Sequence, residues 1–338
     1  MKKIYVIVII NLAFVSQIFA KAAPTLPNSY DGGYISARSM AMGGAATGLR
    51  KSKGAHFYNP AALANAQGSS FEAGYFWIDK NKDGEVLPSG LISASAIADS
   101  MSVTWNNVSD YSQTIRQAGG SRQSKEAVVS AITFAIANPA ETLSFVTDTG
   151  KPQKENKNQT MMGSAFTYLY ARAADSFVDA AANDAGANTS SGNGFSYDLS
   201  FLAPLSNTLS IGLNLKNIVG FMFWNDYDRE QLPFSIRAGL GYEYKWLTIA
   251  FDWDKKYYRF TDMKGDFLHF GIEQFVSSFF ALRAGFISRT NMDRDSFVYT
   301  YGFGLKIKNY EISGALEHND VFGSKLDKYI ISVGMTID

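Results

Sequence analysis

The alternation of apolar and polar residues between positions 195 and 338 is the feature that most constrains the fold. From Ile236 to Trp246, the even positions carry Ile, Ala, Leu, Tyr, Tyr and Trp, whereas the odd positions carry Arg, Gly, Gly, Glu and Lys. Successive strand side chains point to opposite faces, so one face of this run is apolar and the other is polar. Nine consecutive runs share the pattern, and roughly 9 to 11 tilted residues cross a bilayer. The pattern predicts a transmembrane antiparallel β-barrel.

The connections between these runs alternate between short links and long polar loops. Bacterial outer-membrane barrels have tight periplasmic turns and longer outside loops, so we expect the last strand, Asp327 to Asp338, to end in the periplasm. The short links are Pro204 to Asn207, Lys245, Val276 to Ser278 and Lys308 to Asn309, and the long loops are Asn217 to Pro233, Lys255 to Gly265, Ser288 to Ser296 and His318 to Lys325.

The N-terminal half carries a weaker strand signal. Five runs are strand candidates, of which the last two are the weaker. They are Ser70 to Ile78, Leu91 to Ala98, Met101 to Val108, Thr142 to Thr149 and Met161 to Arg172. Five plus nine predicted strands make fourteen, an even number, as a barrel with both chain ends in the periplasm requires. One link does not fit, because Lys151 to Thr160 is long where a short turn is expected.

Between the third and fourth candidates the apolar residues follow a helical spacing. Val129, Ile132 and Ile136 lie 1, 4 and 8 positions after Val128, which favours one face of a helix over a strand. The residue before a proline is disfavoured in helical conformation, so Asn138-Pro139 would end this helix. We therefore predict a short helix here, in an outside loop.

Composition and the first residues agree with export to the bacterial outer membrane. Met1 to Ala20 has a basic start, an apolar stretch and a small-residue end, which predicts a cleavable signal peptide. Residues 21–68 then form an N-terminal segment, and residues 69–338 form the barrel. The chain has no Cys and a net charge of 0, so neither thiolate metal sites nor a nucleic-acid partner is indicated. Lipid and the barrel-assembly machinery are the expected partners, and the oligomeric state is left open.

The alternation also places charged residues of both signs inside the barrel. In one interpretation these charges pair across the lumen, because charges kept out of lipid need partners or water. In the alternative, some of them bind the head group of a ligand, with Arg237 and Arg283 first because a guanidinium holds a carboxylate through two hydrogen bonds, and with Glu273 and Lys306 beside them. The predicted lumenal set is Asp198, Lys216, Arg237, Glu243, Asp252, Glu273, Arg283, Lys306 and Glu311.

Two motifs before the first strand resemble a known family. Ala37 to Ala45 reads ARSMAMGGA, and His56 to Leu63 reads HFYNPAAL. Together they resemble the N-terminal signature of the FadL superfamily of outer-membrane proteins. Leu232 to Gly239, together with Gly271 to Glu273 and Leu282 to Phe286, resembles most the PorV-like and spirochaetal branch of that superfamily.

The resemblance implies a fourteen-stranded barrel whose lumen is plugged by an N-terminal hatch, roughly Asp31 to Gly68. Asn59, Pro60 and Ala61 would sit inside the lumen. In the transporters of the family, a hydrophobic ligand leaves sideways beside a kinked third strand. Local chemistry supports a compact plug, because glycines such as Gly43 and Gly44 permit irregular backbone and close packing, and Pro60 restricts a turn.

The third predicted strand departs from this family pattern, and the sequence by itself does not support a lateral gate. Met101 to Val108 contains neither Pro nor Gly, and Asn106-Asn107 is where a kink could form.

Two functions of different class follow from these patterns. The first is a porin-like channel for passive uptake of small hydrophobic molecules, fatty-acid-like or aromatic. The second is a PorV-like secretion accessory, scaffold or surface antigen without transport activity. No cofactor or metal site is expected. A hydrolase would need a nucleophile and a base on a shared rim, and no such set can be assembled, so we do not expect an enzyme.

Overall fold

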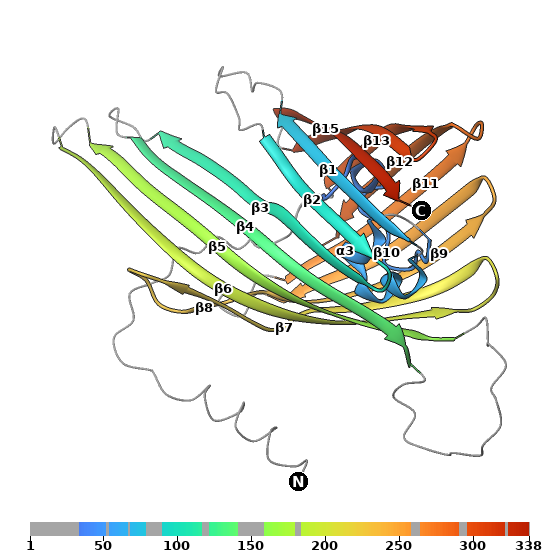
Figure 1. Cartoon of the computed structure of the whole chain (residues 1–338). Helices are drawn as coiled ribbons and strands as arrows, with labels where there is room; N and C mark the ends of the chain where they lie inside the picture. Colours follow the sequence, from blue (N-terminus) through green and yellow to red (C-terminus); the bar gives the residue numbers. More distant parts are fainter. Residues whose placement is uncertain are drawn as a thin grey trace, which may run out of the picture.

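The computed structural model describes residues 34–51, 54–66, 68–78, 90–116, 122–140, 159–179, 184–257, 264–290, 296–321 and 324–337 of the 338-residue chain. These residues form one antiparallel sheet that closes on itself (Figure 1). Apart from the two-residue β8 (Glu230–Gln231), each strand pairs with its neighbours in sequence, and pairing of β1 with β15 closes the ring. The predicted transmembrane-type β-barrel is therefore confirmed.

The ring contains fourteen strands, because β8 has two residues and pairs with β7 alone among the strands. The strands of the N-terminal half are β1 (Ser69–Ile78), β2 (Gly90–Ala98), β3 (Met101–Arg116), β4 (Arg122–Pro139) and β5 (Met161–Asp179). The nine predicted C-terminal strands correspond to β6 (Asp184–Pro204), β7 (Leu209–Trp224), β9 (Phe234–Tyr244), β10 (Leu247–Tyr257), β11 (Lys264–Phe275), β12 (Phe280–Arg289), β13 (Ser296–Ile307), β14 (Tyr310–Val321) and β15 (Ser324–Ile337), and β8 is Glu230–Gln231.

The predicted helix around Val128 is wrong, because these residues belong to β4. Val128, Ile132 and Ile136 are separated by four positions, and an even separation also keeps residues on one face of a strand. Their side chains are exposed on the outer surface, whereas Val129 is buried on the inner one. The predicted strand Thr142 to Thr149 lies outside the described residues, and β4 supplies the strand that completes the count of fourteen.

The outer surface of the barrel is a band of large apolar side chains. This is the face that a lipid environment requires. Alternate positions of each strand supply it, as the sequence pattern predicts. Members include Phe71, Tyr75, Val103, Phe134, Phe166, Tyr168, Phe223, Leu240, Phe251, Leu282, Tyr299, Tyr301, Ile331 and Val333.

Leu240→Arg should destabilise the barrel by about 2 to 4 kcal/mol if the residue lies near the bilayer midplane. Leu240 is exposed on the outer face of β9, so the substitution places a charge in lipid. The loss is measured by urea unfolding in lipid vesicles, in which heat-dependent gel migration reports the folded fraction at each urea concentration. Leu240→Ala is the control for lost apolar surface, and an equal loss in both variants would contradict the assignment of this face.

The neighbouring Gly239 is not the mild lumenal control that the alternation suggests. A Cβ at this position would lie 2.2 Å from Oδ1 of Asp252 and 2.8 Å from Cβ of Thr47. The lumen has no room there, so an arginine at Gly239 would also disrupt packing.

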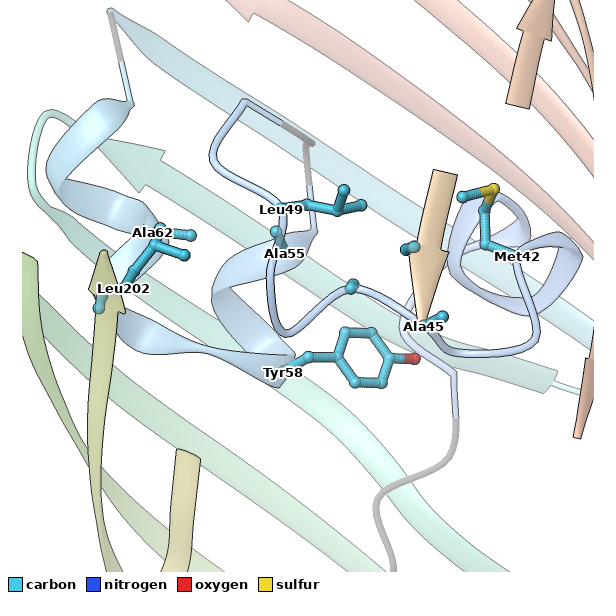
Figure 2. Close-up of a cluster of buried hydrophobic side chains, with 10 residues drawn as sticks. Met42, Ala45, Leu49, Ala55, Tyr58, Ala62 and Leu202 are labelled. Carbon is cyan, nitrogen blue, oxygen red and sulfur yellow. The ribbon is translucent and has the colours of Figure 1, made fainter. Parts of the chain in front are cut away.

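Residues 34–51 and 54–66, here called the N-terminal segment, lie inside the ring. The segment contains α2 (Ala37–Ala41), α3 (Ala55–Tyr58) and the 3₁₀ helix η1 (Pro60–Asn65). Figure 2 shows side chains from Met42 to Ala62 gathered with Leu202 of β6 in one buried cluster. None of the helices in the described part of the chain is long and apolar enough to cross a membrane.

Candidate functional site

The N-terminal segment approaches the inner wall closely because glycines face it from several strands. A Cβ on Gly212 would lie 1.9 Å from the carbonyl oxygen of Thr47, and a Cβ on Gly285 would lie 2.5 Å from the backbone nitrogen of Gly43. Any side chain at these two positions would displace the segment. Similar close approaches occur at Gly163, Gly239, Gly241 and Gly271.

The predicted hatch residues are all in this tightly packed region. Gly43 and Gly44 have φ values of +60° and +73°, a left-handed conformation that favours glycine, and they end α2. Asn59 is buried, and its Nδ2 donates to the carbonyl oxygens of Thr47, at 2.7 Å, and Phe201, at 3.0 Å.

Pro60 opens η1, and the amide of the next residue, Ala61, ties the helix to the wall. This amide donates to Oδ1 of Asn59, at 3.1 Å, and to Oγ of Ser200 on β6, at 2.9 Å. A buried amide with two acceptors is well satisfied. The start of η1 is therefore connected both to the segment itself and to the barrel.

Asp252 connects the segment to one side of the wall. Its Oδ2 accepts hydrogen bonds from the backbone amides of Ala46, at 2.9 Å, and Thr47, at 3.0 Å, and from the Thr47 hydroxyl, at 2.8 Å. Arg237 lies beside this carboxylate at 2.9 Å and also donates to the carbonyl oxygen of Gly44. The predicted lumenal pair thus binds backbone of the N-terminal segment.

A second ion network lies on the adjacent strands β11 and β12. Glu273 is fully buried on β11 and pairs with Arg38 from α2 and with Arg283 from β12, the latter at 2.7 Å. Arg283 also donates to Glu311, at 2.8 Å, and to Ser313. Arg38 lies in the family-like motif, and pattern alone could not place its guanidinium against a strand 235 residues away.

The lumenal charges have two interpretations, pairing with one another and binding of a ligand head group. The geometry shows arginine–carboxylate pairs. Both arginines predicted first as ligand anchors, Arg237 and Arg283, are occupied by carboxylates. One cavity of about 360 Å³ lies at the end of the barrel that carries the short turns, and it is lined by Arg283, Glu273 and Lys306. Arg237 lies elsewhere in the lumen. The ligand-binding role of all four residues stays a prediction.

A smaller cavity, here called the upper cavity, lies between the N-terminal segment and β3 to β7. Its volume is about 40 Å³. Phe57 and Pro60 of the segment line it, and so does Leu232, which follows β8. Leu232 is buried against Gly220 of β7, and its amide donates to the Gly220 carbonyl oxygen at 3.1 Å.

A bulge in β7 directs polar side chains toward the upper cavity. The β6–β7 ladder is regular up to Tyr197–Val219 and resumes at Leu199–Leu215, so Asp198 faces an extended stretch of β7. Asn217 in this stretch has a φ of +54°, and its amide donates to Oδ1 of Asp198 at 2.8 Å. Bulges re-aim side chains at sites in barrels, and here Asp198, Lys216 and Asn217 all line the cavity.

Among the described residues, pairing between β2 and β3 beside the upper cavity stops before β3 ends, which is here called the interruption of the wall. Their ladder runs from Ala98–Met101 to Ser93–Asn106, whereas β3 continues along β4 to Arg116. The β3–β4 register shifts between Asn107 and Ser109, so Val108 is a bulged residue. The irregularity lies next to Asn106-Asn107, where the sequence left room for a kink.

Several of these features escaped sequence reasoning. The β7 bulge has one local signal, because Asn is among the residues that most readily adopt positive φ. Within each single strand, the alternation of side chains indicates that the hydroxyl-bearing residues of the upper cavity face the lumen. Their alignment across strands is a long-range property that pattern does not supply.

Comparison with solved structures identifies the same architecture elsewhere. The Ralstonia pickettii toluene transporter TbuX matches with a TM-score of 0.67 at 12% identity, over 91% of this chain and 99% of TbuX. The monoaromatic hydrocarbon channel CymD matches with a TM-score of 0.63 at 13% identity, over 90% of this chain and 97% of CymD.

A Pseudomonas aeruginosa FadL homologue also matches, with a TM-score of 0.63 at 11% identity, over 90% of this chain and 98% of the homologue. No family model and no curated protein matches the sequence. The resemblance read from the N-terminal motifs is confirmed at the level of the fold, which is that of the FadL-type outer-membrane channels.

Proposed function

We propose that this protein is a channel of the bacterial outer membrane for the passive uptake of small hydrophobic molecules. The observation that carries the proposal is the interruption of the wall between β2 and β3. A hydrophobic molecule gains by leaving the lumen directly into the bilayer, where its apolar surface avoids water. A channel for hydrophilic solutes has no use for an opening toward lipid.

The upper cavity lies where such a route would begin. Asn106 is the last β3 residue that pairs with β2, and it lines this cavity. Phe57, Leu169 and Leu232 supply apolar surface there. The N-terminal segment packs closely against the wall, so a route through it would require the segment to be displaced.

The similar solved structures support this choice. TbuX is described as a toluene transporter and CymD as a monoaromatic hydrocarbon channel. At 11 to 13% identity they share the fold with this chain, and function depends on the lumen and loops that a fold carries. Aromatic or fatty-acid-like compounds are therefore the first substrates to test.

The size of the upper cavity favours the second candidate, a secretion accessory, scaffold or surface antigen. A volume of about 40 Å³ holds a few waters, whereas a cavity known to bind benzene has a volume of about 150 Å³. Transport of such a molecule therefore requires side chains that line the cavity, such as Leu232 or Phe57, to move.

Uptake by intact cells separates the two candidates. The initial uptake rate of radiolabelled toluene and of a long-chain fatty acid should be higher in cells that produce the protein than in cells that carry an empty vector. Heat-dependent gel migration of outer-membrane fractions controls for folded protein. Equal rates with folded barrel present would reject transport of these compounds and favour the accessory role.

A further inference from the structure

Five hydroxyl-bearing side chains form a continuous row across the inner wall. Each faces the next directly across a strand pair: Ser95 of β2 faces Thr104, Thr104 faces Thr133, Thr133 faces Thr167, and Thr167 faces Ser196 of β6. The Ser95 and Thr104 oxygens are 3.0 Å apart, and the Thr133 and Thr167 oxygens are 2.9 Å apart. The row crosses the five neighbouring strands β2 to β6.

His56 of α3 stands at one end of this row. Its Nε2 lies 3.2 Å from Oγ of Ser95 and 3.4 Å from Oγ1 of Thr104. The side chain is 6% exposed. The imidazole therefore bridges the N-terminal segment and the start of the hydroxyl row.

His56 also lines two cavities at once. One is the upper cavity of about 40 Å³, which Thr104, Thr133, Thr167 and Ser196 line as well. The other, here called the lower cavity, has a volume of about 630 Å³ and is lined by η1 and by strand ends at the short turns, including Ser70 and Thr336. The imidazole is thus a shared wall between a chamber inside the lumen and a chamber at the short-turn end.

The chemistry of the row suits uncharged polar molecules. Each hydroxyl can donate and accept a hydrogen bond, and burial lowers the pKa of His56 to about 4, so its ring is neutral at pH 7. Asp198 and Lys216 contribute one charge of each sign to the upper cavity. Arg50 and Lys51 line the lower cavity. The five side chains of the row itself are uncharged, so an ion beside the row would lose hydration without a compensating charge there.

We propose that the hydroxyl row lines a second route through the barrel, for water and small uncharged hydroxylated solutes such as glycerol, with His56 as its constriction. The route connects the upper cavity with the lower cavity and leads to the short-turn end. It differs from hydrophobic uptake in its solute and its exit, and it does not depend on that activity. At about 40 Å³ the upper cavity holds only a few waters, so passage of glycerol requires the side chains around the His56 constriction to move.

Swelling of proteoliposomes in glycerol, followed by stopped-flow light scattering, tests the route. His56→Ala should raise the glycerol rate about tenfold, equivalent to removing about 1.4 kcal/mol from a barrier, while sucrose stays excluded. His269→Ala is the matched control, because His269 also contacts the N-terminal segment, through the Gly43 carbonyl oxygen at 2.8 Å, and lines neither cavity. A similar rise in both variants, or ion conduction by His56→Ala, would mean general loosening and would overturn the proposal.

Substitution of the hydroxyl-bearing residues provides a second test of the proposed route. Thr133→Val with Thr167→Val removes two hydroxyls at nearly constant shape, and in the His56→Ala background it should abolish most of the gain in glycerol rate. An undiminished gain would show that the row is not the lining. If His56→Ala does not fold, the same double substitution in the unchanged chain must lower the basal glycerol rate, and an unaltered rate overturns the proposal.

Discussion

Deleting residues 34–66 should turn a nearly silent barrel into an ion-conducting pore. The backbone hydrogen bonds of the wall run from strand to strand and close on themselves, so the barrel does not need the segment to satisfy its main chain. The segment, in contrast, is mostly buried inside the ring, against the inner faces of the strands. Single-channel recording in planar bilayers should show openings for the deletion variant and almost none for the intact protein.

Folding of the deletion variant is checked by heat-dependent gel migration. A folded but silent variant would show that wall side chains block the lumen by themselves. The buried cluster that includes Met222, Trp224 and Leu232 is the first candidate for such a block. That result would speak against the N-terminal segment as a hatch and in favour of a non-transport role.

Glu273→Gln should destabilise the protein by about 3 to 5 kcal/mol, the usual cost of removing one partner from a buried ion pair. Glu273 is fully buried between Arg38 and Arg283, and the substitution leaves both guanidinium groups without this charge. Because Arg38 lies in α2, the loss should also loosen the N-terminal segment. Urea unfolding in lipid vesicles gives the change in free energy.

Glu311→Gln is the matched control for this network. Glu311 also pairs with Arg283, but its side chain is 22% exposed, so water can replace part of the interaction. We expect a loss of about 1 kcal/mol, as for partly exposed pairs. Equal losses in the two variants would contradict the central place of Glu273.

Much of the wall could be predicted because it depends on local alternation. The strands from β6 to β15 follow from side chains that must face either lipid or lumen, as Leu240 and Gly239 do in β9. The spacing of apolar residues led to the wrong prediction for β4, because residues four positions apart share a face both in a helix and in a strand. A spacing of four residues therefore does not distinguish a helix from a strand, and the length of the segment and its flanking residues must decide between them.

The lumen could be predicted in kind but not in detail. Alternation identified Arg237, Asp252, Glu273 and Arg283 as inward charges. Their partners depend on how the N-terminal segment folds back onto the strands, as Arg38 does against Glu273. Contacts over such separations arise from packing and register, which a single sequence does not encode in any local pattern.

The hydroxyl row illustrates the same limit. Thr133 and Thr167 are unremarkable in their own strands, and they become neighbours through the β4–β5 register. The bulge at Val108 has no Gly or Pro beside it, and its one sequence signal is the adjacent Asn106-Asn107. Both features support proposals about function, and both were identified from the pairing of the strands.

Uptake by a variant that lacks Val108 tests the proposed sideways exit most directly. Removing the bulged residue should restore a regular register between β3 and β4 and narrow the interruption beside β2. Initial uptake of radiolabelled toluene, at equal amounts of folded protein in the outer membrane, should then fall toward the rate of cells that lack the protein. An unchanged rate in the Val108 deletion would contradict uptake through the gap between β2 and β3.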